Sequence, residues 1–113
     1  MSVKGNGNKK SKFVHIYNSA DEAVADIPSG ASLLAGGFGL CGVPENLIEA
    51  LAKRDLKDFH VISNEGGVKY HGLDVMIEKK QIKRFVCSFI GENKEFERQF
   101  LSGEMEVELT PQV

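Results

Sequence analysis

The order of apolar and polar segments predicts an α/β fold, a mostly parallel sheet with flanking helices. Segments of strand-like composition alternate with segments of helical periodicity, which is typical of repeated strand–helix–strand units. The apolar run of residues 32–35 does not alternate with polar residues, and this indicates a buried strand of a parallel sheet. A glycine-rich stretch, residues 36–42, joins that strand to a helix-like segment, a connection that brings backbone N–H groups close to a ligand.

The first expected elements precede the glycine-rich stretch. Residues 13–17 are β-like, since aromatic and β-branched residues dominate them. Ser19 and Glu22 have the spacing of a capping box, which predicts the start of a short helix. Residues 28–30 contain proline and glycine and predict a turn before the strand at 32–35. The side chains of the helix that we expect to face inward are Ala23, Val24 and Ile27.

A helix over residues 44–54 follows the glycine-rich stretch. Pro44 suits its first position, because a helix leaves that N–H without an intrahelical partner in any case. The next strand covers residues 58–63 and ends in a turn at residues 64–67. The expected apolar stripe of the helix consists of Leu47, Ile48, Leu51 and Ala52.

The same alternation continues in the second half. A short helix is expected over residues 73–79 and a strand over residues 83–89. Asn93 can cap a helix over residues 94–101, and Gly103 can end it. The side chains of this helix that we expect to face inward are Phe96, Phe100 and Leu101.

The last expected element, residues 105–109, alternates apolar and polar residues like an edge strand. Neither a closing helix nor a polar tail follows it. We therefore expect a domain that is truncated at its carboxyl end and leaves apolar faces exposed. The predicted organisation is a basic disordered tail at residues 1–12 and a partial domain at residues 13–113.

The composition is that of one globular domain and argues against several classes of function. The chain has 113 residues, and its formal net charge of −2 argues against a nucleic-acid surface. No stretch is long and apolar enough to cross a bilayer, and residues 1–12 lack the features of a secretory signal or a transit peptide. Cys41 and Cys87 have no metal-ligand spacing, which fits a reducing compartment, and the three histidines have none either. No metal site is expected.

The glycine-rich stretch is the most informative motif, but read alone it allows more than one interpretation. Residues 37–42 match G-x-G-x-x-G between a strand and a helix, the pattern of a dinucleotide-binding turn. That interpretation needs an acidic residue about 20 residues further on. Glu65 lies somewhat farther than that, and Pro44 is unusual for the pattern. A tight glycine turn without a ligand is the other possibility.

Several separated motifs together point to one family. They are Gly36-Gly37-Phe38, Gly42-x-Pro44 with residues 45–48, Ser63-Asn64, and residues 80–84, 91–99 and 101–112. In this order they resemble the signature of family I coenzyme A transferases, most closely the amino-terminal, α-subunit-like half of the succinyl-CoA:3-ketoacid type. The resemblance covers residues 12–112 and implies a Rossmann-like CoA-transferase α-type domain.

The resemblance implies an enzyme that transfers CoA from succinyl-CoA to a 3-ketoacid such as acetoacetate, as in ketone body catabolism. In the family a glutamate carboxylate attacks the thioester and then carries CoA as an enzyme-bound thioester. That glutamate belongs to the carboxyl-terminal half or to a separate β subunit, so we expect this chain to be inactive alone. An asparagine amide faces the oxyanion, and Asn64 matches it, although alone it could be an ordinary turn residue. CoA is a substrate, and no cofactor is implied.

The resemblance also implies a set of binding residues. The glycine loop would border the acyl and CoA site, with Phe38 as an apolar wall. Phe89 and Gln112 match positions that line the ketoacid pocket. Phe89 is commonly a tyrosine there, and without the resemblance it would be read as plain core. The implied substrate- and CoA-binding residues are Gly37, Phe38, Gly39, Gly42, Phe89 and Gln112.

Two positions depart from the family pattern. Glu65 stands in place of a second asparagine, and we interpret it as a solvated turn acid rather than as a substitute for the nucleophile. Lys69 stands where an acidic residue is usual, which alters the local loop contacts. Cys41 lies in the glycine loop, but the chemistry needs no thiol.

Partners and compartment follow from the resemblance as well. The complete enzyme is expected to be a homo-oligomer that includes the complementary half or β subunit, with no nucleic-acid or membrane partner. Family members work in the mitochondrial matrix of eukaryotes and in the cytoplasm of bacteria. The likeness to the single-chain type favours the matrix, although no transit peptide is visible. The alternatives are a non-catalytic remnant that pairs with a full-length homologue and a dinucleotide-binding module.

Overall fold

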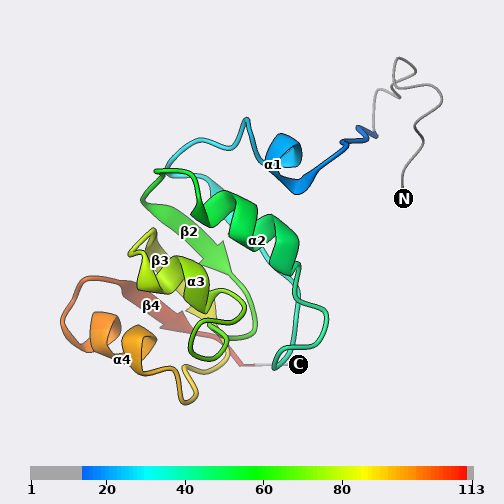
Figure 1. Ribbon diagram of the computed structural model, residues 1–113. Coiled ribbons are helices and arrows are strands. Elements are labelled where there is room, and N and C mark those ends of the chain that lie inside the picture. Colours follow the sequence, from blue (N-terminus) through cyan, green and yellow to red (C-terminus); the bar gives the residue numbers. More distant parts are fainter. Residues whose placement is uncertain (1–13, 112–113) are drawn as a thin grey trace.

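Four parallel strands, connected by helices, form one sheet in the computed structural model, which describes residues 14–111 (Figure 1). The strand order across the sheet is the order along the chain, β1-β2-β3-β4, and the expected α/β fold is confirmed. The tail at residues 1–12 and Gln112 lie outside the described residues. The elements are α1 Ala20–Ala23, β1 Ser32–Leu34, α2 Glu45–Ala52, β2 Phe59–Ile62, α3 Asp74–Glu78, β3 Ile82–Cys87, α4 Lys94–Leu101 and β4 Glu106–Leu109.

The core lies between one face of the sheet and a single layer of helices. Three strand–helix–strand crossovers follow one another across the sheet, and crossovers of one hand place their helices on one face. Figure 1 shows α2, α3 and α4 side by side over that face, and α2 contacts α3, which contacts α4. The rings of Phe85 on β3 and Phe96 on α4 pack with their centroids 4.8 Å apart. The fully buried apolar side chains are Phe59, Val61, Met76, Ile77, Phe85 and Phe96.

The opposite face of the sheet is uncovered within residues 14–111. Leu34, Ile62 and Val86 are neighbours across the first three strands, and Leu34 is 78% exposed. The expectation that residues 32–35 form a fully buried strand is wrong, because β1 is an edge strand whose outer face has no helix over it. A parallel sheet is usually covered on both faces, so this exposed apolar row is unusual.

The amino-terminal segment differs from its prediction in one element. Residues 14–17 form no strand and pair with none of the four strands, and the side chain of Val14 is 50% exposed. Their β-branched and aromatic composition does not suffice, because a strand needs a partner for its backbone groups. The N-cap half of the predicted capping box is present: the Oγ of Ser19 accepts a hydrogen bond of 3.1 Å from the backbone N–H of Glu22.

Helix α2 begins one residue later than predicted and turns a slightly different side inward. Pro44 is the N-cap rather than the first helical residue, with φ −78° and ψ 70°. Leu47 is 43% exposed, so its place in the predicted stripe is wrong, whereas Ala50 is buried. The reason is the position of α2 between α1 and α3, both of which it contacts.

Helix α4 has the predicted bounds and the predicted cap. The side chain of Asn93 accepts from the N–H of Phe96 over 2.9 Å. Phe96 is fully buried, but Phe100 and Leu101 are 39% and 73% exposed, contrary to the prediction. Gln99 is buried with Phe96, and its Nε2 donates to the carbonyl of Ile77 over 2.8 Å. The buried stripe is narrow because α4 lies at the end of the helix layer, where α3 is its main helical neighbour.

Strand β4 is an edge strand, as its alternation predicts. On the uncovered face of the sheet, Arg84 of β3 forms ion pairs with Glu106 and Glu108 of β4. Within residues 14–111, no helix has the length and apolar character needed to cross a membrane.

Candidate functional site at the carboxyl edge of the sheet

The loops that follow β1, β2 and β3 begin at the same edge of the sheet. Ladder hydrogen bonds continue past the strand ends: Ala35 N–H donates to Ile62 over 3.0 Å, and Ser88 N–H donates to the carbonyl of Asn64 over 2.9 Å. The carboxyl ends of parallel strands are where α/β folds bind their ligands. Asn64 therefore lies where the sequence predicts it, just beyond the end of β2.

The loop after β1 contains a tight hairpin. Phe38 and Cys41 exchange two backbone hydrogen bonds, of 2.9 and 3.0 Å, around Gly39 and Leu40. Gly39 has φ 63° at the first central position, which is the requirement of a type II′ turn. At Gly37, a Cβ atom would lie 2.6 Å from the Cγ2 of Val43. The hairpin therefore depends on glycine for both its turn and its close packing.

The loop after β2 approaches the glycine loop closely. Gly72 packs close to two side chains of the glycine loop. A Cβ atom on Gly72 would lie 3.7 Å from Cδ2 of Leu40 and 3.9 Å from Cγ1 of Val43. Gly67 has φ 82°, and a Cβ there would overlap the carbonyl oxygen of His71. Gly72 thus lets side chains of the glycine loop approach the loop after β2, and Gly67 lets the backbone of that loop pack against itself.

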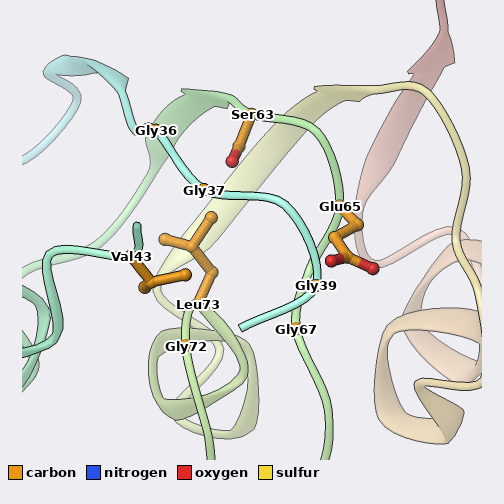
Figure 2. Close-up of a pocket in the computed structure, with 9 residues that line it drawn as sticks. All are labelled: Gly36, Gly37, Gly39, Val43, Ser63, Glu65, Gly67, Gly72 and Leu73. Atoms are coloured by element: carbon orange, nitrogen blue, oxygen red, sulfur yellow. The ribbon is translucent and has the colours of Figure 1, made fainter. Parts of the chain in front are cut away.

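A small cavity lies between these two loops. Its volume is about 10 Å³, which is room for one water molecule. Figure 2 shows the side chains of Ser63 and Glu65 extending from the loop after β2 toward the glycine loop. The lining residues are Gly36, Gly37, Gly39, Val43, Ser63, Glu65, Gly67, Gly72 and Leu73.

Two consecutive residues at this edge have buried acceptor atoms without a partner. Asn64 Oδ1 and Glu65 Oε1 are inaccessible to solvent, and no residue in the described range donates a hydrogen bond to either. Glu65 is half-buried, and one of its two carboxylate oxygens is shielded, so the expectation of a solvated turn acid does not hold for that oxygen. Buried polar atoms that lack a protein partner mark the sites of water or ligand groups.

The structure brings some of the predicted binding residues together and separates others from them. Gly37 and Gly39 line the cavity with Ser63 and Glu65, whereas Gly42, with φ 76°, does not. The rings of Phe38 and Phe89 are 61% and 39% exposed and lie outside this cavity, so the reading of Phe89 as plain core is wrong. Gln112 lies outside the described residues, and Cys41 is an exposed free thiol.

Sequence reasoning missed a residue that supports the site. Asp74, in the first turn of α3, is fully buried, and its Oδ2 accepts a hydrogen bond of 2.6 Å from the N–H of Tyr70. A carboxylate next to the buried Leu73 and two positions before Met76 is the signal that could have revealed it. No cluster of three metal-binding side chains occurs in residues 14–111.

The fold and this edge define an α/β ligand-binding domain, and comparison with known proteins identifies its family. Residues 17–113 match the coenzyme A transferase family. The chain is 56% identical over 97 residues to one subunit of a probable succinyl-CoA:3-ketoacid coenzyme A transferase of Mycobacterium tuberculosis, and 53% identical to the corresponding subunit from Bacillus subtilis. It is 50% identical over 96 residues to the human mitochondrial succinyl-CoA:3-ketoacid coenzyme A transferase 2. The chain therefore belongs to the coenzyme A transferase family.

The match covers most of this chain but a minor part of the relatives. It includes 86% of the chain, but only 39% of the M. tuberculosis protein and 41% of the B. subtilis protein. For the human protein the shares are 85% and 19%.

Solved structures have the same fold. An acyl-CoA transferase of Escherichia coli O157:H7, solved as a thioester complex with CoA, superposes with a TM-score of 0.68 at 24% identity, over 82% of this chain and 20% of that one. The decarboxylase AibA/AibB gives a TM-score of 0.66 at 25% identity, over 80% and 37%. One fold thus carries both transferase and decarboxylase chemistry, and function has to be argued from the site.

Proposed function

We propose that this chain forms one wall of a CoA-transfer site that moves CoA from succinyl-CoA to a 3-ketoacid such as acetoacetate. The observation that carries the proposal is the position of Asn64 at the carboxyl edge of β2, where its backbone carbonyl accepts a hydrogen bond from the N–H of Ser88 beyond β3. The names of the relatives that are 50–56% identical to this chain support the choice of substrates, and they favour transfer over decarboxylation.

The proposed reaction uses a glutamate from outside this chain. Its carboxylate attacks the thioester carbonyl, the tetrahedral intermediate collapses, and CoA leaves as a thiolate, so that a mixed anhydride remains. The thiolate then attacks the glutamyl carbonyl, which forms a glutamyl-CoA thioester and releases succinate. The 3-ketoacid carboxylate repeats the two steps in reverse order and leaves as the new acyl-CoA.

In this scheme Asn64 is the residue of the chain that contributes to catalysis. Each tetrahedral intermediate carries a negative oxygen, and the Nδ2–H group of Asn64 donates a hydrogen bond to it. A fixed donor of this kind stabilises the transition state more than the ground state. Because the amide is held by a loop anchored to the strand end, it needs little reorganisation during the reaction.

The binding residues belong to the same proposal. The backbone N–H groups of the glycine loop border the acyl and CoA groups, and Phe38 supplies an apolar wall. Exposed aromatic rings such as Phe38 and Phe89 are suited to contact a ligand or a partner protein. The proposed substrate- and CoA-binding residues are Gly37, Phe38, Gly39, Gly42, Phe89 and Gln112.

The proposal requires a partner, because the nucleophile lies outside this chain. The partner is the complementary half or β subunit in a homo-oligomeric enzyme, and the chain alone is inactive. Residues 13–113 act as part of the amino-terminal domain of the complete enzyme. The compartment is that of the host's enzyme, the mitochondrial matrix in a eukaryote and the cytoplasm in a bacterium.

Fragment complementation tests the proposal. The chain is mixed with the β subunit of the B. subtilis enzyme and with the part of the related B. subtilis polypeptide that this chain does not match. Acetoacetyl-CoA formation from succinyl-CoA and acetoacetate is followed by ultraviolet absorbance. Transfer should require all three components, and the same mixture without this chain is the control.

Two results would contradict the proposal. Copurification of the three components without transfer would favour the non-catalytic remnant. Protection of the chain against thermal unfolding by NAD but not by CoA would favour a dinucleotide-binding module. The hairpin between β1 and α2 speaks against the latter, because a dinucleotide turn leads directly into its helix.

A further inference from the structure

The loop that carries Asn64, residues 63–73 between β2 and α3, is anchored to the rest of the domain at two places. The first anchor continues the sheet. The N–H of Ser63 donates to the carbonyl of Val86 over 3.0 Å, and the carbonyl of Asn64 accepts from the N–H of Ser88 over 2.9 Å. These bonds fix the start of the loop, but the course of the backbone beyond Asn64 is set by other contacts.

Asn93, the N-cap of α4, supplies the second anchor. Its Nδ2 donates to the carbonyl of Gly67 over 3.2 Å and to that of Gly66 over a longer 3.5 Å. Within residues 14–111, no backbone N–H donates to either carbonyl. The Asn93 amide is therefore the protein group that satisfies this stretch of backbone, two to three residues after Asn64.

Asn93 is itself held rigidly. Both Asn93 and Asp74 are buried, and the Nδ2 of Asn93 also donates to Oδ1 of Asp74. The Oδ1 of Asn93 accepts from the N–H of Phe96, so the side chain is bonded at both of its polar atoms. Rotation of the amide would leave a buried carboxylate oxygen without its donor, which opposes any change of rotamer.

The anchored stretch of loop lies between the core and the small cavity. A Cβ atom on Gly66 would lie 2.6 Å from Cδ2 of Phe96 and 2.8 Å from Cδ1 of Ile77, so the backbone packs directly on these side chains. Gly67 lines the cavity, as does Gly39 of the glycine loop (Figure 2). A shift of this stretch would therefore move one wall of the candidate site.

We propose that Asn93 is a positioning residue for CoA transfer, because it fixes the loop that presents the Asn64 amide to the oxyanion. The inference rests on the proposed function. Asn93 touches no substrate in this scheme and acts only through Asn64. Misplacement of a catalytic group by about 1 Å lowers a rate by up to roughly 100-fold, so release of the loop should lower kcat.

A double-mutant cycle in the complemented enzyme, reconstituted from the three components, tests the proposal. Asn93→Ala, Asn64→Ala and the double variant are compared at a temperature at which circular dichroism shows each chain to be folded. Asn93→Ala should lower kcat by roughly 10-fold to 100-fold. The KM for acetoacetate should stay within about twofold, since the donor acts on the transition state.

The background decides whether Asn93 acts through Asn64. In a chain that already carries Asn64→Ala, the further change Asn93→Ala should leave kcat unchanged, because no amide remains to be positioned. Loss of kcat by the same factor in both backgrounds overturns the proposal. An unchanged kcat in Asn93→Ala alone overturns it as well.

Gln99→Ala is the matched control for stability. Gln99 is buried on the same helix, but its Nε2 donates to the carbonyl of Ile77 and not to the loop after β2. Its replacement should destabilise the chain by the loss of a buried donor and leave kcat of the folded enzyme unchanged. If Gln99→Ala lowers kcat as much as Asn93→Ala does, activity follows stability alone and the proposal is wrong.

An exchanged pair serves if Asn93→Ala does not fold. Asn93→Asp combined with Asp74→Asn restores a hydrogen bond between the two side chains, but a carboxylate at position 93 has no N–H to donate to the carbonyl of Gly67. The melting temperature should therefore exceed that of Asn93→Asp alone, while kcat stays low. A wild-type kcat in the exchanged pair contradicts the proposal.

Failure of the inference can be distinguished from failure of the proposed function. If the wild-type mixture transfers no CoA, or if Asn64→Ala leaves kcat unchanged, the proposed function fails and the inference fails with it. If Asn64→Ala lowers kcat as expected but Asn93→Ala acts independently of it, the function stands and the positioning role alone is overturned.

Discussion

The side chain of Asn93 donates from Nδ2 to Oδ1 of Asp74 over 2.7 Å, in a contact buried between the starts of α4 and α3. Asn93 Nδ2 also donates to the carbonyl of Gly67 over 3.2 Å. The other oxygen of Asp74 accepts from Tyr70 N–H. This pair therefore holds the loop after β2, which carries Asn64 and Glu65, against the two helices.

Replacement of Asn93 by alanine should destabilise the chain by about 3 kcal/mol, because Oδ1 of the buried Asp74 carboxylate would lose its donor while Oδ2 keeps the N–H of Tyr70. The measurement is the free energy of unfolding from urea titration. Ser19→Ala is the control: it removes the exposed cap of α1, and its cost should be about 1 kcal/mol. Equal losses in the two variants would contradict a special role for the buried pair.

Gly67→Ala and Gly30→Ala form a matched pair, since both glycines have φ 82°. Alanine at Gly30 meets open space, so only the left-handed backbone conformation, about 1–2 kcal/mol, opposes it. Alanine at Gly67 also collides with the carbonyl of His71. The decrease in melting temperature should therefore be clearly larger for Gly67→Ala. Similar decreases would show that the backbone at His71 shifts at little cost to relieve the overlap.

The stability of the chain should depend on pH through Arg98. Hydrogen bonds from Arg98 hold the pKa of Glu95 at about 2, and they do the same for Glu104. An unfolded chain, with its glutamates at their ordinary pKa of 4.5, binds more protons in this range. The stabilisation is thus fully present above pH 4.5 and is lost as pH falls toward 2.

Arg98→Met should flatten this acid limb of the pH–stability curve. Urea unfolding at several pH values between 2 and 6 measures it, and Glu97→Gln, on the same helix, serves as the control. An unchanged slope in Arg98→Met would mean that other carboxylates cause the acid sensitivity.

The two cysteines should react at very different rates with a thiol reagent. Burial raises the pKa of the Cys87 thiol to about 11, and its side chain is 2% exposed, whereas Cys41 is exposed. The thiolate is the reactive form, so at neutral pH one thiol of the native chain should react fast with the reagent. Cys41→Ser should abolish this fast reaction. Fast reaction of both thiols in the native chain would show that β3 opens readily.

Asn64→Ala should lower kcat of the complemented enzyme by roughly 10²–10³, with little change in KM, if the amide acts only on the transition state. Asn64→Asp should be at least as damaging, because a carboxylate repels the oxyanion. A variant that raises KM alone would place Asn64 in substrate binding instead.

Local signals in the sequence were sufficient to predict an element wherever its backbone hydrogen bonds are made within that element. The N-caps at Ser19 and Asn93 set the starts of α1 and α4 correctly, because a cap satisfies backbone groups of its own helix. The strand expected at residues 13–17 is absent over the described residues 14–17, since its backbone groups require a neighbouring strand that the sheet does not provide. Leu47 and Phe100 were misplaced for a related reason: periodicity marks an apolar face, but neighbouring helices decide how much of it is covered.

The sequence by itself determined the α/β class, the order of the elements and the position of Asn64 beyond a strand end. These depend on short-range periodicity, on caps and on glycine, all of which act within one segment. Only the tertiary structure decided that one face of the sheet is uncovered, that Asp74 and Asn93 pair, and that one carboxylate oxygen of Glu65 is shielded. Each of these depends on atoms from segments far apart in the chain, because burial is decided by which segments pack against one another.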